Sequence, residues 1–460
     1  MADTAAAQEF DILILGGGSG GYAAALRAVQ LGFTVGLIEK GKLGGTCLHN
    51  GCIPTKALLH SAEVADTARS AGKYGVQATF ESIDMPAVNA YKDGIVAGKY
   101  KGLQGLIKSK GITVIEGAGK LTSTKTVDVD GTSYTGKNII LATGSYSRTL
   151  PGLEIGGKVI TSDHALTMDT LPKKAIVLGG GVIGCEFASV WKSFGVDVTI
   201  IEGLPSLVPN EDATIIKAFE RAFKKRGINF TTGTFFEKVE QNDDGVVVTL
   251  VDGKTFEADL MLVAVGRGPV TDGLGYEETG VTIDRGFVIT DERLHTGVEN
   301  IYAVGDIVPG LQLAHRGFQQ GIFVAEEIAG LKPVVVEDVN IPKVTYSEPE
   351  IASVGLTEKA AKEKLGEDKV LTHEYNLAGN GKTSILGSAG LVKLVSEKDG
   401  PVVGVHMIGT RMGEQIGEAQ LIVNWEAYPE DVAQLIHAHP TQNEALGEAH
   451  LALAGKALHG

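Results

Sequence analysis

Cysteine is scarce in this sequence. Only Cys47, Cys52 and Cys185 occur among 460 residues, which is too few for a scaffold held together by disulfides. A pair among them therefore indicates a redox-active or metal-binding role rather than a structural one.

Positive charge is also in short supply. The chain has 41 Lys and Arg against 56 Asp and Glu, a net charge of -15, whereas a phosphate-binding surface needs an excess of Lys and Arg. This balance argues against nucleic acid and suits a basic protein partner. No apolar run approaches the ~18 residues of a membrane helix. The N-terminal MADTAAAQEF lacks the features of a signal peptide, so we expect a cytoplasmic protein with a loose tail over residues 1–8.

One unit occurs twice in the chain. Residues 10–39 and 173–202 each read as an apolar strand, a G-x-G-x-x-G turn, an Ala-rich helix and a second apolar strand ending in an acid. The shared positions are Leu15/Leu178, Gly16/Gly179, Gly17/Gly180, Gly18/Gly181, Gly21/Gly184, Ala25/Ala188, Gly32/Gly195, Val35/Val198, Ile38/Ile201 and Glu39/Glu202. A single G-x-G-x-x-G can be a plain glycine-rich turn, but two copies with the acid at the same spacing argue against that reading.

The chemistry of this unit is binding of a dinucleotide. The first glycine makes the tight turn, the second lets the backbone approach a pyrophosphate, and the third allows close helix packing. The pyrophosphate then lies at the helix N-terminus. Glu39 and Glu202 would accept hydrogen bonds from an adenosine ribose, so we expect two bound dinucleotides. The stretch from Glu202 to Asn210 has no Arg or Lys to meet a 2′-phosphate, which favours NAD over NADP.

Cys47 and Cys52 lie in a short segment between the first unit's second strand and the next helix. In a regular helix their Cα atoms would be roughly 8–9 Å apart, beyond the reach of a disulfide. We therefore expect a distorted entry into a helix, with backbone freedom at Gly51 and Pro54 in the first turn. A thiol near a helix N-terminus has a lowered pKa. Zinc is the competing explanation, but no second cysteine pair exists, and we expect no metal.

The segment GGTCLHNGCIPTK resembles the redox-active site of the flavin disulfide reductases. Further motifs follow in that family's order over nearly the whole chain: Ala142-Thr-Gly-Ser145, Gly266-Arg267, Ile301-Tyr-Ala-Val-Gly-Asp306 and His437-Ala-His-Pro-Thr-Gln-Asn-Glu444. The resemblance implies FAD at the first unit, NAD at the second and a homodimer. It also implies that His439, oriented by Glu444, serves the partner subunit's cysteines.

Missing motifs narrow the substrate within that family. No cysteine follows Cys185, unlike in mercuric reductases and high-molecular-weight thioredoxin reductases, and glutathione reductases carry basic residues after the acid. The remaining resemblance implies oxidation of protein-bound dihydrolipoamide, with a lipoyl-bearing acyltransferase or a glycine cleavage carrier protein as partner. The chain departs from the pattern of lipoamide enzymes at Leu48-His49-Asn50, at Val270 and over Arg316–Gln320. These departures concern the fine tuning of the site and not the class of enzyme.

The predicted fold class is α/β, with two Rossmann-like domains that bind FAD and NAD and a C-terminal α+β dimerisation domain. Residues 1–150 would form the FAD-binding domain and 151–269 the NAD-binding domain. Residues 270–340 would complete the FAD site, and 341–460 would form the interface domain.

The candidate site residues follow from the motifs and the resemblance. The catalytic candidates are Cys47, Cys52, His439, Glu444, Lys56 and Glu186. The cofactor-binding candidates are Gly16, Gly18, Gly21, Glu39, Lys40, Gly45, Thr46, Lys56, Gly119, Thr143, Gly144, Ser145, Gly179, Gly181, Gly184, Glu186, Glu202, Val239, Gly266, Asp306, Gln312, Leu313, Ala314 and His315. Cys185 is expected to be a buried, inert thiol, and His49, His60, His295, His373 and His406 are expected to be structural or surface residues.

The expected cycle begins when His439 removes a proton from dihydrolipoamide and the thiolate attacks Cys52. Cys47 would lie nearer the flavin and pass the electrons on. Two rival hypotheses stay open: a related reductase for another low-molecular-weight disulfide, and a nucleotide-binding scaffold in a larger assembly. Retention of both cysteines together with the His–Glu pair disfavours the scaffold.

Overall fold

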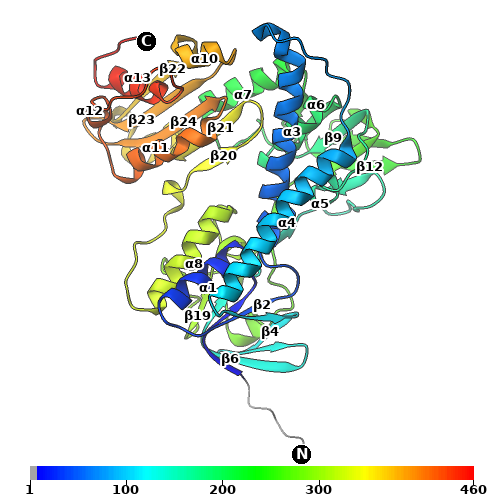
Figure 1. The fold of residues 1–460 in the computed structure, drawn as a ribbon, viewed down its shortest axis with the longest axis vertical. Coiled ribbons are helices and arrows are strands. Elements are labelled where there is room, and N and C mark those ends of the chain that lie inside the picture. The colour runs from blue at the N-terminus through cyan, green and yellow to red at the C-terminus, as the bar shows by residue number, and fades with distance from the viewer. Residues whose placement is uncertain (1–7, 460) are drawn as a thin grey trace, which may run out of the picture.

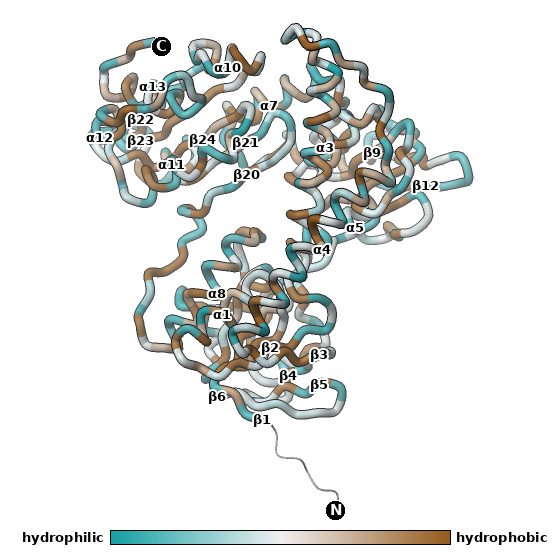
Figure 2. Tube along the Cα trace, viewed as in Figure 1, coloured by the Kyte–Doolittle hydropathy of each residue, from teal (hydrophilic) through white to brown (hydrophobic). Residues whose placement is uncertain are grey.

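The computed structural model describes residues 8–459, which form three lobes (Figure 1). The loose tail predicted over residues 1–8 lies outside the described residues except for Gln8, which is the first residue of a strand. In Figure 2 hydrophobic stretches follow the strands inside the lobes. Among the described residues, no helix combines the length and the apolar character that crossing a bilayer requires.

The first unit is built on a seven-stranded sheet in the order β3-β2-β1-β6-β5-β4, with β19 added beside β6. Its strands are β1 (Gln8–Leu15), β2 (Val35–Glu39), β3 (Thr113–Glu116), β4 (Gly119–Ser123), β5 (Thr126–Val129), β6 (Thr132–Leu141) and β19 (Ile301–Ala303). The pairs β1–β2, β2–β3, β1–β6 and β19–β6 are parallel, and helices cross over between β1 and β2 and between β2 and β3. The chain therefore returns to this sheet after leaving it for the second unit.

Two helices of this unit cross at very short range. They are α1 (Ser19–Gln30) and α8 (Ala314–Ile328). A Cβ on Gly321 would lie 2.2 Å from the carbonyl oxygen of Gly20, so only glycine allows the two backbones to approach this closely.

Three α-helices lie between β2 and β3. They are α2 (Gly45–His49), α3 (Cys52–Ser70) and α4 (Met85–Ser109). Asp84 caps α4 by accepting a 3.1 Å hydrogen bond from the Ala87 N–H. Helix α3 packs against α4 and against α6 of the second unit, which brings the cysteine segment to the junction of the two units.

The second unit repeats the parallel arrangement in a five-stranded sheet of order β11-β10-β9-β15-β8. Its strands are β8 (Val159–Thr161), β9 (Lys174–Leu178), β10 (Asp197–Glu202), β11 (Asn229–Thr232) and β15 (Leu260–Val263), with a small antiparallel sheet of β12 (Phe236–Gln241), β13 (Val246–Leu250) and β14 (Thr255–Ala258). Its helices are α5 (Ser162–Ala165), α6 (Val182–Ser193) and α7 (Ala213–Lys225). Strands β7 (Ser145–Ser147) and β16 (Arg267–Pro269) pair where the chain enters and leaves this unit. A short hairpin of β17 (Ile283–Asp284) and β18 (Phe287–Val288) follows.

The third unit is an antiparallel sheet of order β20-β21-β24-β23-β22 covered by helices. Its strands are β20 (Lys343–Thr345), β21 (Glu350–Gly355), β22 (Val370–Asn376), β23 (Leu391–Glu397) and β24 (Val402–Gly409). Its helices are α9 (Glu358–Leu365), α10 (Gly381–Ile385), α11 (Met412–Asn424), α12 (Pro429–Val432) and α13 (Glu444–Leu453). Two parallel α/β units followed by an α+β unit confirm the predicted fold class.

Candidate functional site

In the first glycine turn, packing within the chain explains two of the three motif glycines. Gly16 has φ +109°, and a Cβ there would lie 2.2 Å from the Ala142 carbonyl oxygen. A Cβ on Gly21 would lie 1.8 Å from the Gly16 oxygen. Gly18 differs, because its φ is −72° and its nearest neighbour would be Gly45 Cα at 4.0 Å. Neither the backbone conformation nor the packing of the chain requires glycine at position 18. The lack of a side chain there leaves room for a bound ligand.

The second glycine turn shows the same division. A Cβ on Gly179 would lie 2.3 Å from the Ala264 oxygen, and one on Gly184 would lie 1.9 Å from the Gly179 oxygen. Gly181 has φ −75° and nothing within 4 Å of its Cβ position. The middle glycine of each turn thus borders open space at a helix N-terminus, where a pyrophosphate fits.

The two acids at the strand ends hold their glycine turns. Glu39 accepts hydrogen bonds from the N–H groups of Gly17 and Gly41, both at 2.7 Å. Glu202 accepts from the N–H of Gly180 at 2.6 Å and of Leu204 at 2.8 Å. Each carboxylate therefore shapes its turn and stands beside it, at the carboxyl end of a parallel strand.

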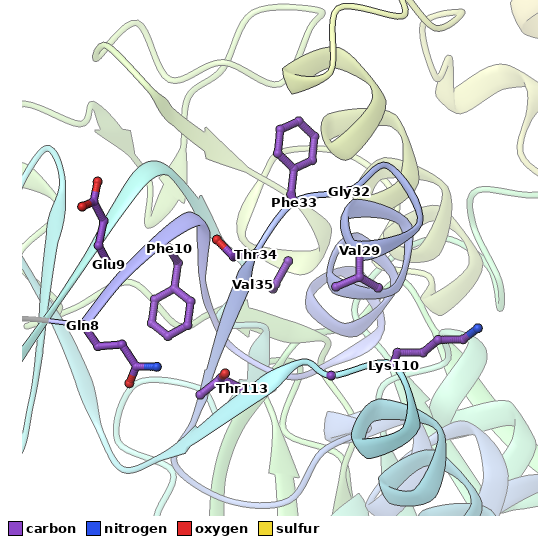
Figure 3. A pocket seen from close by; sticks show the side chains of 11 residues that line it. Gln8, Glu9, Phe10, Val29, Gly32, Phe33, Thr34, Val35, Lys110 and Thr113 are labelled. Carbon is purple, nitrogen blue, oxygen red and sulfur yellow. The ribbon is translucent and has the colours of Figure 1, made fainter.

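A cavity of about 340 Å³ lies beside the first of these acids. Glu39, Gly41, Leu43, Tyr100 and Gln104 are among its lining residues. A second cavity, of about 390 Å³, lies at the opposite end of the strands, where β1 and β2 begin (Figure 3). Because nucleotides bind outside the carboxyl ends of such strands, the cavity at Glu39 is better placed for a nucleotide than the other one.

Ser145 and Asp306 are hydrogen-bonded beside the β7–β16 pair, where the first unit joins the second. Ser145 Oγ donates to Asp306 Oδ2 at 2.5 Å. Arg267 donates to Ser145 twice, from Nε to the hydroxyl oxygen and from Nη2 to the carbonyl oxygen, both at 2.7 Å. Arg267 was not among the predicted site residues. The Gly266-Arg267 motif is recognisable in the sequence, but its contact with Ser145 across the β7–β16 pair is not.

The departures from the family pattern near this junction have structural partners. Arg316 is 5% exposed and donates from Nε to Asp338 Oδ1 at 2.7 Å. Gln320 accepts from the Gly305 N–H at 2.8 Å, and this contact holds the turn that carries Asp306. Val270 offers its carbonyl oxygen to Thr143 Oγ1 at 2.6 Å, so this contact uses the backbone rather than the side chain.

The remaining predicted cofactor residues occupy varied positions. Gly45 packs on Gly18, Lys40 is exposed after β2, and Thr46 accepts from Arg267 at 3.4 Å. Gly119 begins β4, Val239 lies in β12, and Gly144 and Gly266 have positive φ next to the β7–β16 pair. Gln312 donates to the Asp306 carbonyl oxygen at 3.3 Å, and Leu313 caps α8, which Ala314 and His315 begin.

The cysteine pair lies where two helices meet, with a short helix, α2, before the helix whose distorted entry was predicted. Helix α2 carries Cys47 and ends at His49, and α3 begins at Cys52 after Gly51, whose φ is −149°. The two thiols hydrogen-bond to each other, and this bond, with burial, raises the pKa of Cys47. The same bond, aided by the Lys56 charge, lowers the pKa of Cys52 to about 7. Cys52 is thus the thiol that ionises first.

Lys56 and Glu186, two of the predicted site residues, form an ion pair close to the cysteines. Lys56 Nζ donates to both carboxylate oxygens of Glu186, at 2.9 and 2.7 Å. Burial acts to lower the pKa of Lys56, but Glu186 more than compensates and raises it. Tyr346, which was not predicted, donates its N–H to Glu186 at 3.0 Å and places its ring centroid 4.8 Å from Lys56 Nζ. The cluster therefore joins all three units.

His439 and Glu444 form a pair in the third unit. His439 Nδ1 lies 2.8 Å from Glu444 Oε1, and Glu444 Oε2 accepts from the Thr441 N–H at 2.7 Å. Burial would raise the pKa of Glu444, but the Thr441 and His439 contacts lower it, so the carboxylate stays charged. The His439 side chain is 78% exposed, and α13 lies in a different lobe from α3 (Figure 1).

Cys185 and His437 have hydrogen-bond partners of their own. Cys185 is fully buried and donates to the Gly180 oxygen at 3.3 Å, and burial raises its pKa. His437 is 2.7 Å from Glu418, and this hydrogen bond raises its pKa. Within residues 8–459, no three His, Cys, Asp or Glu side chains gather as a metal ion would require.

Comparison with known proteins agrees with this arrangement. The family model for pyridine nucleotide-disulphide oxidoreductases matches residues 10–321, and the model for that family's dimerisation domain matches residues 341–450. The chain belongs to the pyridine nucleotide-disulphide oxidoreductase family.

The relatives are more specific about the branch of that family. The chain is 43% identical to a dihydrolipoyl dehydrogenase of Bacillus subtilis, over 98% of this chain and 100% of that protein. It is 40% identical to the mitochondrial dihydrolipoyl dehydrogenase of Pisum sativum, over 98% and 93% of the two chains. A crystal structure of LpdA from Mycobacterium tuberculosis superposes with a TM-score of 0.89 at 27% identity, covering 97% of this chain and 99% of the other.

These findings confirm the predicted family, the oxidoreductase class and the cofactors FAD and NAD. The dimerisation domain supports the predicted homodimer.

Proposed function

We propose that the chain oxidises protein-bound dihydrolipoamide to lipoamide and reduces NAD to NADH. The observation that carries this proposal is the position of the Cys47–Cys52 pair, beside Lys56–Glu186 and between two nucleotide turns. The relatives named dihydrolipoyl dehydrogenase confirm the activity predicted from the sequence. Bound FAD supplies the two-electron relay between the disulfide and NAD.

The chain's own residues carry the thiol chemistry. In the oxidised enzyme, a substrate thiolate attacks one sulfur of the Cys47–Cys52 disulfide, and the other sulfur leaves as a thiolate. The second substrate thiol then closes lipoamide and releases the first cysteine, so two substrate S–H bonds are oxidised as one protein disulfide is reduced. His439, held by Glu444, accepts the substrate proton.

The order of the two cysteines differs from the expectation above. A thiol of lower pKa leaves faster in disulfide exchange, and Cys52 has the lower pKa, with Cys47 as its hydrogen-bond partner and Lys56 nearby. Cys52 also begins α3, where the helix N-terminus favours a thiolate. We therefore assign the substrate's attack to Cys47 and the released thiolate to Cys52.

The cofactor residues predicted from the sequence are part of this proposal. Gly16, Gly18, Gly21 and Glu39 would hold the FAD adenosine and pyrophosphate, and Ser145 and Asp306 its ribityl chain. Gly179, Gly181, Gly184 and Glu202 would hold NAD. The proposed functional divisions are residues 1–150, 151–269, 270–340 and 341–460, and the pairing of β19 with β6 supports the return of the third segment to the FAD unit.

The proposed partner is a lipoyl-bearing protein, either an acyltransferase or a glycine cleavage carrier protein. The net charge of -15 would favour encounter with a basic face of that partner.

A comparison of substrates and coenzymes tests the proposal. Purified enzyme should oxidise dihydrolipoamide with NAD. Replacing dihydrolipoamide by glutathione, or NAD by NADP, should lower kcat/KM severely. Preference for another thiol would favour the rival disulfide reductase. A folded, FAD-loaded protein that turns over none of these substrates would favour the scaffold.

Glu202→Ala should raise the KM for NAD and narrow the discrimination against NADP. The carboxylate would lose its hydrogen bonds to the ribose, each contributing roughly 1.5–3 kcal/mol, and would no longer hold Gly180. We expect an increase of about tenfold or more in KM, measured by steady-state kinetics with each coenzyme. Glu257→Ala, a change on the small sheet's β14, is the control. An unaltered KM would show that another residue selects the coenzyme.

Lys56→Met should move the ionisation of Cys52 to higher pH in the reduced enzyme. Cys47 and Lys56 both lower the pKa of Cys52, to about 7, and loss of the cation removes one of these contributions. The measurement is the rate of Cys52 alkylation by iodoacetamide against pH, read by peptide mass spectrometry. Lys73→Met, at an exposed lysine, should leave the profile where it is. A shift to lower pH in Lys56→Met would contradict this account.

A further inference from the structure

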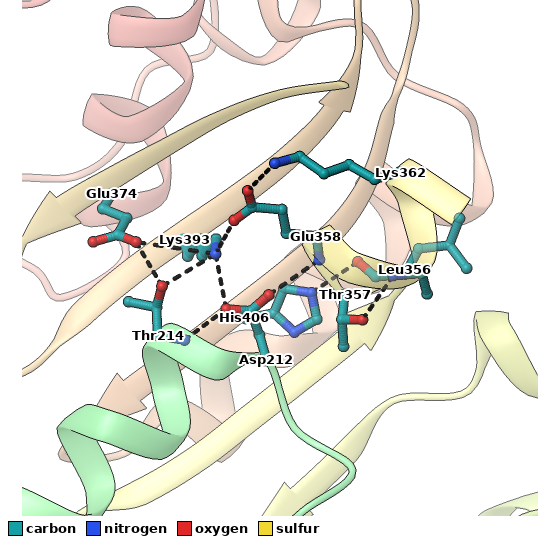
Figure 4. A network of polar contacts seen from close by, with 10 residues as sticks. Asp212, Thr214, Leu356, Thr357, Glu358, Lys362, Glu374, Lys393 and His406 are labelled. Carbon is teal, nitrogen blue, oxygen red and sulfur yellow. Dashed lines mark hydrogen bonds and ion pairs between the residues drawn. The ribbon is translucent and has the colours of Figure 1, made fainter. Parts of the chain in front are cut away.

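A network of charged side chains, with Lys393 and Asp212 buried at its centre, joins the second unit to the third (Figure 4). Lys393, on β23, is 2% exposed, and its Nζ donates to Asp212 Oδ1 at 2.8 Å, to Glu358 Oε2 at 2.6 Å and to Thr214 Oγ1 at 3.1 Å. Asp212, also 2% exposed, caps α7 of the second unit and accepts from the Glu358 N–H at 3.0 Å. The cation of one unit is thus enclosed by acids from both.

Two lysines face three carboxylates in this network. Burial acts to lower the pKa of Lys393, but the hydrogen bonds with Asp212 and Glu358 raise it, so the ammonium stays protonated. Glu374 approaches Lys393 at 4.0 Å, and Lys362 pairs with Glu358 at 2.8 Å. His406 is fully buried, and burial lowers its pKa, so it adds no positive charge. Removal of Lys393 would leave the buried Asp212 carboxylate without its cation, which is costly. Glu358 would keep its pairing with Lys362.

Asp212 ends a segment, residues 203–212, that lies against the second glycine turn. The Val208 N–H donates to the Gly180 carbonyl oxygen at 2.8 Å. The Leu207 side chain would lie 2.5 Å from a Cβ on Gly180. Val208 has φ +41°, an unfavourable conformation for a β-branched residue that its surroundings must maintain. The position of this segment therefore bears directly on the shape of the glycine turn.

The third unit fastens the same segment at a second point. Ser353, on β21, donates to Glu211 Oε2 at 2.6 Å, and Lys343, on β20, donates to the Asn210 carbonyl oxygen at 3.4 Å. Glu211 and Ser353 are both shielded from solvent. The segment is held on one side by the glycine turn and on the other by the sheet of the third unit.

We propose that Lys393 is a positioning residue for NAD, acting through Asp212 to hold residues 203–212 against the Gly180 turn. This inference rests on the proposed use of NAD at that turn. It gives the third unit a second role, because the unit that pairs two subunits also sets the affinity for the nicotinamide nucleotide.

The test is Lys393→Met in the FAD-loaded dimer. We expect the dissociation constant of NADH, titrated by its fluorescence, to rise on the order of tenfold. Hydrogen exchange of the amides in residues 203–212 should accelerate. Reduction of the enzyme by dihydrolipoamide without NAD should stay within about twofold of the wild-type rate, because that step does not use the segment. A merely structural loss would lower stability without this selective loss of nucleotide affinity.

Milder variants and a matched control complete the experiment. Glu358→Gln and Ser353→Ala should each produce a smaller change in the same direction, even if Lys393→Met fails to fold. Lys92→Met removes another buried lysine, 3% exposed and bound to the Leu166 carbonyl oxygen, and should lower stability without weakening NADH binding. Unchanged NADH affinity and unchanged exchange of residues 203–212 in the folded variants would overturn the inference. Failure of the wild-type enzyme to bind NADH would instead overturn the proposed NAD site, and this inference with it.

Discussion

Cys52→Ser should lower the rate of dihydrolipoamide oxidation by more than about a thousandfold, since the substrate's electrons would have no disulfide to enter. FAD should remain bound, because the substitution does not change the glycine turn or Asp306, which would hold it. NADH oxidation by an artificial electron acceptor should therefore persist. Cys47→Ser should have the same effect on the physiological reaction, because both sulfurs are needed.

Cys185→Ala is the matched control for these variants. Its thiol is buried beside Gly180, with a pKa that burial raises, so it takes no part in exchange. Turnover with dihydrolipoamide should be close to wild type. Normal dihydrolipoamide oxidation by Cys52→Ser would show that the electrons take another route.

His439→Gln should lower dihydrolipoamide oxidation by about 10²–10⁴-fold, the usual contribution of a positioned base. Glu444→Gln should lower it less, because the imidazole stays in place but loses the charged partner at its Nδ1. The base would act across the subunit interface, since the His439 side chain is largely exposed and α13 lies in a different lobe from the α3 of its own chain. The measurement is kcat at saturating NAD.

Mixed dimers distinguish a base in the partner subunit from one in the same chain. His439→Gln and Cys52→Ser homodimers should both be nearly inactive, but the heterodimer should regain one working site of its two. His437→Gln, at a residue hydrogen-bonded to Glu418 instead, is the control and should keep more activity than His439→Gln. Heterodimers that form but recover nothing would place the base in the same chain as its cysteines.

The repeated unit was predictable because its constraints are local. The turn at Gly16 and the helix contact at Gly21 both involve backbone within the motif or at the end of the adjacent strand, so the same letters recur in both copies. The break between Cys47 and Cys52 was predictable for a similar reason, because a continuous helix would hold the two sulfurs too far apart. The His439–Glu444 pair spans only five positions.

The contacts that the sequence did not disclose join distant positions. Tyr346 reaches Glu186 across 160 positions, and Lys393 reaches Asp212 across 181. No spacing rule marks such pairs, and a lysine in an apolar strand or a tyrosine before a turn reads as ordinary. The proposed roles of the two cysteines were equally hard to predict, because the proposal rests on the opposite pKa shifts that the thiol–thiol hydrogen bond and Lys56 favour.

Counting the thiols during a half-reaction tests the relay most directly. The oxidised enzyme is mixed with dihydrolipoamide without oxygen or NAD, quenched with an alkylating reagent and digested, and the peptide with Cys47 and Cys52 is weighed. Reduction by dihydrolipoamide should open the disulfide, so that the reagent labels both cysteines of that peptide. Excess NAD added before the quench should restore the disulfide and prevent both labels, while an equivalent amount of NADH forms. Formation of NADH with no change in the labelling of Cys47 and Cys52 would contradict the account.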